Sequence, residues 1–426
     1  MLELVKKFVY DIPPTMRNWT QVILIATFAL SVFPQGVPTP VGTMCISSFA
    51  MLVGLVWIIN KRATQNKSLV PTIVLKHAVV IACAAYFLLG LATFPNCDMP
   101  MYWVKEVVQR TIIIWLPTLV FTLVPQKPKD IQKAILAYLP LCSIIAVATF
   151  WDARHSHFAT PSYAFGMHKN HIAGSCSVMG TIAIAAMLTS KNVHKRLLMI
   201  GFLGLAIIGC FASQGKAGLL CMVVATLFMM FASGVKMKRI LYFGLAIVVS
   251  AGLMWKFMPH EAREHVVSTK KFSTNEIRMT LWTDILPVLT KEPFIAVGWG
   301  QLLLKDGRYF GDGACVLLLD WFQMTILGPI LLLISIFFAV KLPLDNAKRI
   351  PKNTALAFIN LVALGVICGR FFHAMVDSFW IGRGVTLCTW AAIGMALFVK
   401  LYLDQKQKRL LSVSLSRANE STIALK

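Results

Sequence analysis

Residues 171–239 read HIAGSCSVMGTIAIAAMLTSKNVHKRLLMIGFLGLAIIGCFASQGKAGLLCMVVATLFMMFASGVKMKR, and this stretch decides the fold class. It contains three apolar runs, at 171–190, 197–213 and 216–234. Each run is long enough to cross a bilayer, which takes about 20 apolar residues in a helix. Basic residues separate the first run from the second and follow the third, whereas a short turn joins the second to the third. The stretch therefore predicts a chain that crosses a membrane repeatedly.

The same pattern extends over the rest of the chain, where about 12 such spans are predicted. Their approximate ranges are 19–35, 41–60, 69–94, 109–125, 131–151, 171–190, 197–213, 216–234, 239–257, 314–340, 354–373 and 383–402. Short basic loops fall on every second connection, for example at 191–196 and 341–352. Since Lys and Arg concentrate on the cytoplasmic side, these loops and both termini are expected in the cytoplasm.

Composition supports an all-α polytopic membrane protein, because 57% of the residues are hydrophobic and only 14% are charged. The formal net charge of +23 lies mostly in the predicted cytoplasmic loops, where membrane topology and anionic lipids explain it. Nucleic acid is therefore not an expected partner, whereas membrane lipids are. The ten cysteines show no CxxC spacing, and no metal site or cofactor is predicted.

The predicted organisation has four parts: spans 1–9 in 1–257, a periplasmic loop at 258–312, spans 10–12 in 313–402, and a cytoplasmic tail at 403–426. Ser273 and Glu276 have the spacing of a capping box, which predicts an amphipathic helix from about Thr274 to Leu289. Arg278 and Trp282 lie four residues apart and would share one face of it.

Four passages carry a family resemblance. They are FGMHKNHIAG (165–174), SQGKAGLL (213–220), RMTLW (278–282) followed by Pro293 and Gly298-Trp299-Gly300, and the segment from Gly311 to Gly328. Together they resemble the motifs of the O-antigen ligase and polymerase superfamily, over about residues 160–400. Two positions depart from that pattern. Lys216 stands where the family usually has arginine, and no histidine is present near Ala314, where the family has one.

The resemblance implies a metal-independent glycosyltransferase of the bacterial inner membrane with a periplasmic active site. Polysaccharide would move from an undecaprenyl diphosphate-linked glycan to a lipid A–core acceptor. Such a reaction needs fixed cations for the diphosphate leaving group and a base for the acceptor hydroxyl. The polymerase of the same superfamily is the first alternative, and the single long loop favours the ligase. A transporter of a lipid-linked or anionic solute, with Lys76 and His77 as its polar pair, and a scaffold in an assembly complex are the others.

The candidate residues lie at the predicted periplasmic ends of the spans. The substrate-binding candidates are Arg278, Lys216, Lys169, His168, Asn170, Trp282, Arg370 and Arg383. Arginine binds phosphate at two points, which favours Arg278 for the diphosphate. The alternatives are structural: Arg278 and Lys216 would contact lipid headgroups, and Asn170 would cap a helix beginning near Ile172.

Asp312 and His373 are the catalytic candidates, with His168 and Asp377 as further choices for the base. His373 and Asp377 would share a helix face, where they could equally form a structural polar pair. The tryptophans near this side, Trp299 among them, are expected mostly as anchors at the membrane interface.

Overall fold

A computed structural model describes most of the chain. The described residues are 19–34, 36–39, 42–66, 68–156, 158, 162–242, 245, 252, 256, 274–301, 315–376 and 384–424. For 38–39, 42–44, 274–281, 376, 384–385, 409 and 413–424, only the backbone is described.

The described elements are nearly all helical. In chain order they are α2 (Trp19–Phe28), η2 (Ala29–Val32), β1 (Gly36–Thr39), β2 (Gly42–Cys45), α3 (Ile46–Thr64), α4 (Thr72–Leu75), α5 (Ala78–Ala92), η3 (Phe94–Asn96), α6 (Pro100–Arg110), η4 (Thr111–Trp115), α7 (Leu116–Leu123), α8 (Pro128–His155), η5 (Ala164–Gly166), α9 (Lys169–Thr189), α10 (Val193–Ala212), α11 (Lys216–Ala232), α14 (Thr274–Lys291), α15 (Val316–Met324), α16 (Leu327–Ala347), α17 (Ala355–Val376) and α18 (Gly384–Ala424). Strands β1 and β2 form one antiparallel hairpin, in which Gly36 pairs with Cys45.

Within these described ranges, nine helices are long and apolar enough to cross a membrane. They are Ile46–Thr64, Ala78–Asn96, Pro100–Leu123, Pro128–His155, Lys169–Thr189, Val193–Ala212, Leu327–Ala347, Ala355–Met375 and Thr386–Ser412. Two shorter apolar helices, Trp19–Val32 and Lys216–Ala232, match further predicted spans. Most of 239–257 lies outside the described residues, so the total of about twelve stays a prediction. The chain is an all-α, multi-pass membrane protein.

The centre of the bundle is formed by α9, α17 and the first half of α18, which are buried on almost all sides. Small residues permit this close packing. A Cβ added to Gly218 of α11 would lie 2.6 Å from the Ala173 carbonyl oxygen of α9. A Cβ added to Gly369 of α17 would lie 2.8 Å from the Cys221 carbonyl oxygen of α11. Three helices are thus packed almost backbone to backbone.

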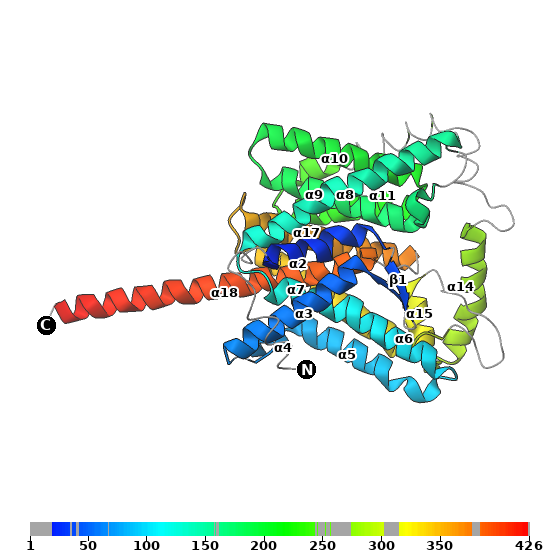
Figure 1. The fold of residues 1–426 in the computed structure, drawn as a ribbon, viewed down its shortest axis with the longest axis horizontal. Helices are drawn as coiled ribbons and strands as arrows, with labels where there is room; N and C mark the ends of the chain where they lie inside the picture. Colours follow the sequence, from blue (N-terminus) through cyan, green and yellow to red (C-terminus); the bar gives the residue numbers. More distant parts are fainter. Residues whose placement is uncertain are drawn as a thin grey trace.

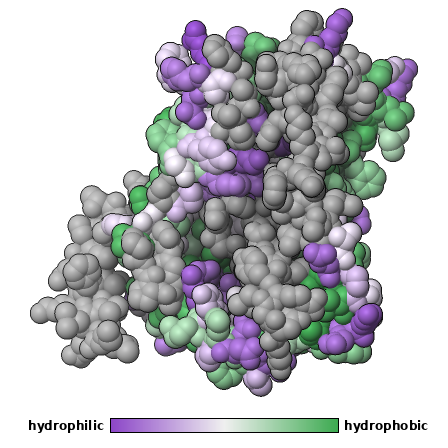
Figure 2. All heavy atoms as spheres, turned by 90° about the vertical axis from the view of Figure 1, so that its right-hand side faces the viewer, coloured by the Kyte–Doolittle hydropathy of each residue, from purple (hydrophilic) through white to green (hydrophobic). Residues whose placement is uncertain are grey.

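The bundle has two chemically different ends. One end, here called the basic end, carries the short basic loops: Lys400 of α18 and Arg349 after α16 both contact Asp404 there. Helix α18 extends from this end, and α14, α15 and the β1–β2 hairpin lie at the opposite end (Figure 1). The latter is here called the α14 end. Figure 2 faces the α14 end, and hydrophilic side chains are scattered across the described part of that face.

Two predicted spans differ from the observed helices. The span predicted at 314–340 is two helices, because Thr325, with φ 67°, lies between α15 and α16 in a conformation that ends a helix. The span predicted from residue 69 begins at Ala78, after the short α4. Lys76 and His77 therefore lie before that membrane-spanning helix, at its basic end.

Candidate functional site

The turn between α10 and α11 places Lys216 at the α14 end. As expected, this turn is short, since α10 ends at Ala212 and α11 begins at Lys216. Gly215 packs so closely on α9 that an added Cβ would lie 2.1 Å from the Cβ of Ala173. The exposed Lys216 is thereby held beside the first turns of α9.

The residues His168, Lys169 and Asn170 form the start of α9, and all three are half-buried. His168 is the helix cap, because its Nδ1 accepts a hydrogen bond from the Asn170 amide at 3.3 Å. The capping role considered for Asn170 is therefore wrong: the helix starts earlier than expected, at Lys169. The His168 ring also packs edge-on against Tyr163, at 6.2 Å between ring centroids.

Arg370 and His373 lie near the end of α17 and are both buried, with exposed fractions of 2% and 1%. The Arg370 guanidinium hydrogen-bonds to Nδ1 of His373. Because α17 runs antiparallel to α11, with Gly369 against Cys221, His373 lies one turn further towards the first turn of α11. The structure thus brings α9, α11 and α17 together at the same end and gives His373 an arginine partner.

The predicted loop helix is confirmed as α14, although its first residues carry only a backbone description. Ile285 and Leu289 are buried and pack with Val297 and Phe322, as expected for one apolar face. Trp282 is half-buried. Arg278 lies in the helix, but its side chain is outside what the structure describes. Asp312, Asp377 and Arg383 lie outside the described residues altogether.

A buried polar cluster at this end was not predicted. It is centred on Arg110, whose side chain is fully buried at the end of α6. The Arg110 guanidinium donates from Nε to Glu106 at 2.8 Å and from a terminal nitrogen to the Tyr86 hydroxyl at 2.5 Å. Tyr86 in turn donates to Asp320 at 2.8 Å, and Asp320 is also fully buried. These four residues are here called the Arg110 cluster.

The Arg110 cluster holds the segment that follows α14. The guanidinium carbon of Arg110 lies 4.3 Å from the centre of the Trp299 ring, which is a cation–π contact. The Trp299 amide donates to the Thr93 hydroxyl at 3.2 Å. Gly298 and Gly300 flank it with φ angles of 96° and 78°, which favour glycine. Trp299 is fully buried and is not an interface anchor, contrary to expectation.

The segment that follows α14, residues 293–300, is also fixed to α15. The Val297 amide donates to the Phe322 carbonyl and the Gly298 amide to the Gln323 carbonyl, each at 3.2 Å. The Trp321 indole donates to the Pro293 carbonyl at 3.0 Å. Helix α14 is consequently joined to the bundle by backbone bonds, a buried ring and a buried charge, and its second half has a defined position.

One sequence signal could have revealed this cluster. Asp320 stands alone in the apolar run of α15, and ionisable residues in such runs usually have a partner or a function. The identity of the partner could not be read, because Tyr86, Arg110 and Asp320 are far apart in the chain. The predicted span 109–125 includes Arg110 near its start, whereas the observed span begins at Pro100 and places Arg110 well inside it.

Chemically, the α14 end is suited to an anion. Helices α9 and α11 both begin there, and helix N-termini present unsatisfied N–H groups and a positive dipole end. Lys169 and Lys216 are the first residues of those two helices. Groups of three or more His, Cys, Asp or Glu side chains that could hold a metal ion do not occur in the described part of the chain.

Comparison with known proteins gives no family assignment. No protein-family model matches the chain, and no curated protein matches it.

Proposed function

We propose that the chain is a membrane glycosyltransferase that moves polysaccharide from undecaprenyl diphosphate to a lipid A–core acceptor at the periplasmic face. The proposal combines the family resemblance of the motifs with one structural observation. The GWG segment (298–300), which belongs to one of those motifs, is fixed by Arg110 of α6, by the Thr93 hydroxyl after α5 and by backbone bonds to α15. A loop that carries substrate-binding residues needs such support, because catalytic geometry must be held closely.

In this proposal, cations at the α14 end bind the diphosphate leaving group. Lys216 and Lys169 act from the first turns of α11 and α9, where the helix dipoles add to their charge. Arg278 acts from α14 and approaches from the side of the loop. Stabilising the developing charge on the leaving group in this way typically contributes about 10²–10³ in rate for each donor.

The acceptor hydroxyl requires a base, and His373 or Asp312 fills this role in the proposal. The Arg370 guanidinium donates a hydrogen bond to Nδ1 of the buried His373, which fixes the ring orientation. The neutral ring then carries its hydrogen on Nε2, so Nδ1 is its basic nitrogen in the proposal. Arg383 and Trp282 complete the proposed substrate contacts, the first by charge and the second by stacking on a sugar ring. His168 caps α9, and in the proposal it contacts the substrate together with Lys169 and Asn170 at the same helix start.

Gene deletion followed by gel analysis of lipopolysaccharide and of carrier-linked glycan tests the proposal. A ligase deletion leaves full-length glycan on the carrier and none on the core. Core that bears a single repeat unit indicates the polymerase of the superfamily instead. Unchanged glycans in both fractions refute both enzymes and leave the transporter and scaffold hypotheses.

A variant pair on α14 tests the role of Arg278. Arg278→Ala should reproduce the deletion, whereas Lys291→Ala, at the other end of the same helix, should not. Both variants remove one positive charge from α14, so a change in helix charge alone would affect them equally. Near-normal product from Arg278→Ala at wild-type protein level removes Arg278 from the site.

Sidedness can be measured independently. Single cysteines introduced in segment 258–312 of a cysteine-depleted chain should react with a membrane-impermeant maleimide from the periplasm. If the cysteines react only after the membrane is permeabilised, the loop lies in the cytoplasm. The proposed glycosyl transfer at the periplasmic face would then be refuted.

A further inference from the structure

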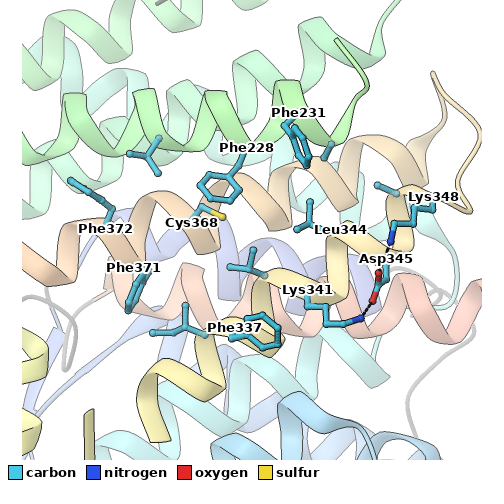
Figure 3. A pocket seen from close by; sticks show the side chains of 15 residues that line it. Phe228, Phe231, Phe337, Lys341, Leu344, Asp345, Lys348, Cys368, Phe371 and Phe372 are labelled. Carbon is cyan, nitrogen blue, oxygen red and sulfur yellow. Dashed lines mark hydrogen bonds and ion pairs between the residues drawn. The ribbon is translucent and has the colours of Figure 1, made fainter. Parts of the chain in front are cut away.

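An apolar groove of about 850 Å³ opens between α11 and α16, with α17 as its floor. Its walls include Phe228 and Phe231 of α11, Phe337 and Val340 of α16, and Phe371 and Phe372 of α17 (Figure 3). Several wall residues are largely exposed, among them Phe231 at 66% and Phe337 at 60%. In a membrane-spanning bundle such exposed side chains contact lipid, so the groove is open to the bilayer.

Charged residues close the groove at the basic end. Lys341 and Lys348 both contact the carboxylate of Asp345, and the Lys348 contact is 3.1 Å long. The two lysine side chains are still 52% and 76% exposed. Figure 3 shows this trio at one end of the groove and Phe372 at the other. Two ammonium groups sharing one carboxylate give the trio a net charge of +1.

A further cation, Lys352, lies beside the end of α11, outside the groove lining but at the same end. A Cβ added to Gly234, two residues after α11, would lie 3.6 Å from the Lys352 ammonium nitrogen. The groove end is therefore bordered by cations from both sides, Lys341 and Lys348 on α16 and Lys352 before α17. Such an end attracts a singly charged anion that can accept several hydrogen bonds.

The length of the groove matches one leaflet. Along α16 it extends from Ile336 to Lys348, which corresponds to about 18 Å of helix at 1.5 Å per residue. Half of a hydrocarbon core is about 15 Å thick. A lipid with its phosphate at Lys348 would therefore extend its acyl chain along Phe337 towards Phe372.

We propose that this groove binds an anionic glycerophospholipid, with the acyl chain between α11 and α16 and the phosphate at Lys341 and Lys348. Charge complementarity selects this occupant, because basic pockets between membrane helices bind anionic headgroups. The proposed phosphate site at Lys341 and Lys348 lies at the end of the bundle opposite the candidate glycosyltransferase site, and lipid binding there does not depend on that function. A second copy of the chain, or a segment of the chain outside the described residues, would be a different occupant.

Photo-crosslinking tests the proposal. The purified full-length protein in nanodiscs of phosphatidylcholine receives a trace of phosphatidylglycerol with a photoreactive group in its acyl chain, and labelled peptides are identified by mass spectrometry. Labelling is expected on the α11 and α16 wall segments, 224–232 and 336–348. Added unlabelled phosphatidylglycerol should remove it, and added phosphatidylcholine should not.

Variants then test the charged end. Lys341→Gln combined with Lys348→Gln should reduce labelling of the groove about ten-fold or more, since each surface cation contributes about five-fold to binding an anionic lipid. Asp345→Asn should raise it, because the trio gains positive charge. The control, Lys406→Gln with Lys408→Gln, removes the same charge from exposed positions on α18 and should change labelling little.

Three outcomes would overturn the proposal. Equal competition by phosphatidylcholine would mean that the groove holds bulk lipid without selection. Labelling that persists in the double lysine variant would show that Lys341 and Lys348 do not contribute to lipid binding. Absence of groove labelling, together with chemical cross-links from the groove to another segment or to a second copy, would show that protein fills it.

Discussion

Arg110→Met should destabilise the protein by about 3–5 kcal/mol, because it removes one partner of a buried ion pair. Methionine keeps an unbranched stem like that of arginine but lacks the charge that faces Asp320. Asp320 is fully buried and would retain only the Tyr86 hydroxyl. Glu106 is 17% exposed and can still be hydrated, so most of the cost arises at Asp320. Loss of the cation–π contact with Trp299 adds about 0.5–2 kcal/mol.

The assay is equilibrium unfolding by SDS in mixed micelles, followed by tryptophan fluorescence. Lys105→Met is the matched control, since it also replaces a cationic side chain by methionine, at an exposed position of the same helix. Combining Arg110→Met with Asp320→Leu should cost less than the sum of the two single changes, because no buried charge is left without its partner. If Arg110→Met and Lys105→Met differ by less than about 0.5 kcal/mol, the pair does not stabilise the fold and the reasoning fails.

Three further predictions concern other residues of the bundle. Gly90→Ala should destabilise the protein by about 1–3 kcal/mol in the SDS titration, because the added Cβ would lie 1.9 Å from the Trp299 ring. Gly204→Ala is the control: its Cβ would meet nothing within 4 Å, so the substitution should be neutral or stabilising. Asp130→Ala should lower the free energy of unfolding by about 0.5–2 kcal/mol in the same titration, because this carboxylate accepts two backbone N–H bonds, at 3.0 and 3.1 Å, where α8 begins. Asp130→Asn should retain more stability, and an equal loss in both variants would contradict the capping role. Burial lowers the pKa of His77 below 6.5 in the folded state, so the unfolded state takes up the proton first as pH drops. The free energy of unfolding should therefore fall as pH drops from about 7.5 through 6.5. His77→Gln should show a smaller fall, and an identical pH profile in this variant would refute the pKa shift.

The positions of the helices could be predicted from the sequence because each span must form its backbone hydrogen bonds internally and present apolar side chains to lipid or to other helices. Their ends could be read less well. The predicted start at residue 69 ignored that Lys76 and His77 remain outside the long helix. The interruption at Thr325 gave no hydropathy signal, since α15 and α16 are both apolar. The hairpin at residues 36–45 was likewise too short to be noticed.

The candidate site was predicted only in part. The sequence placed Lys169 and Lys216 at the same end of the bundle, because successive spans alternate in direction and both residues stand where a span begins. The pairing of Arg370 with His373 follows from helical spacing, yet it was not anticipated. The Arg110 cluster depends on contacts between distant parts of the chain, and single-residue properties do not encode such contacts.

The π-helical turn η4 has a consequence for the span that contains it. A π turn holds one residue more than an α turn, so it rotates all following side chains by about 100°. Before this turn, Arg110 faces α5 and α15; after it, Thr118 and Thr122 donate to carbonyls of α18 at 3.1 and 3.3 Å. Deleting a single residue here would leave a continuous apolar helix with one of its two faces turned away from its partner. The span therefore has a fixed residue count, a constraint that no hydropathy profile detects.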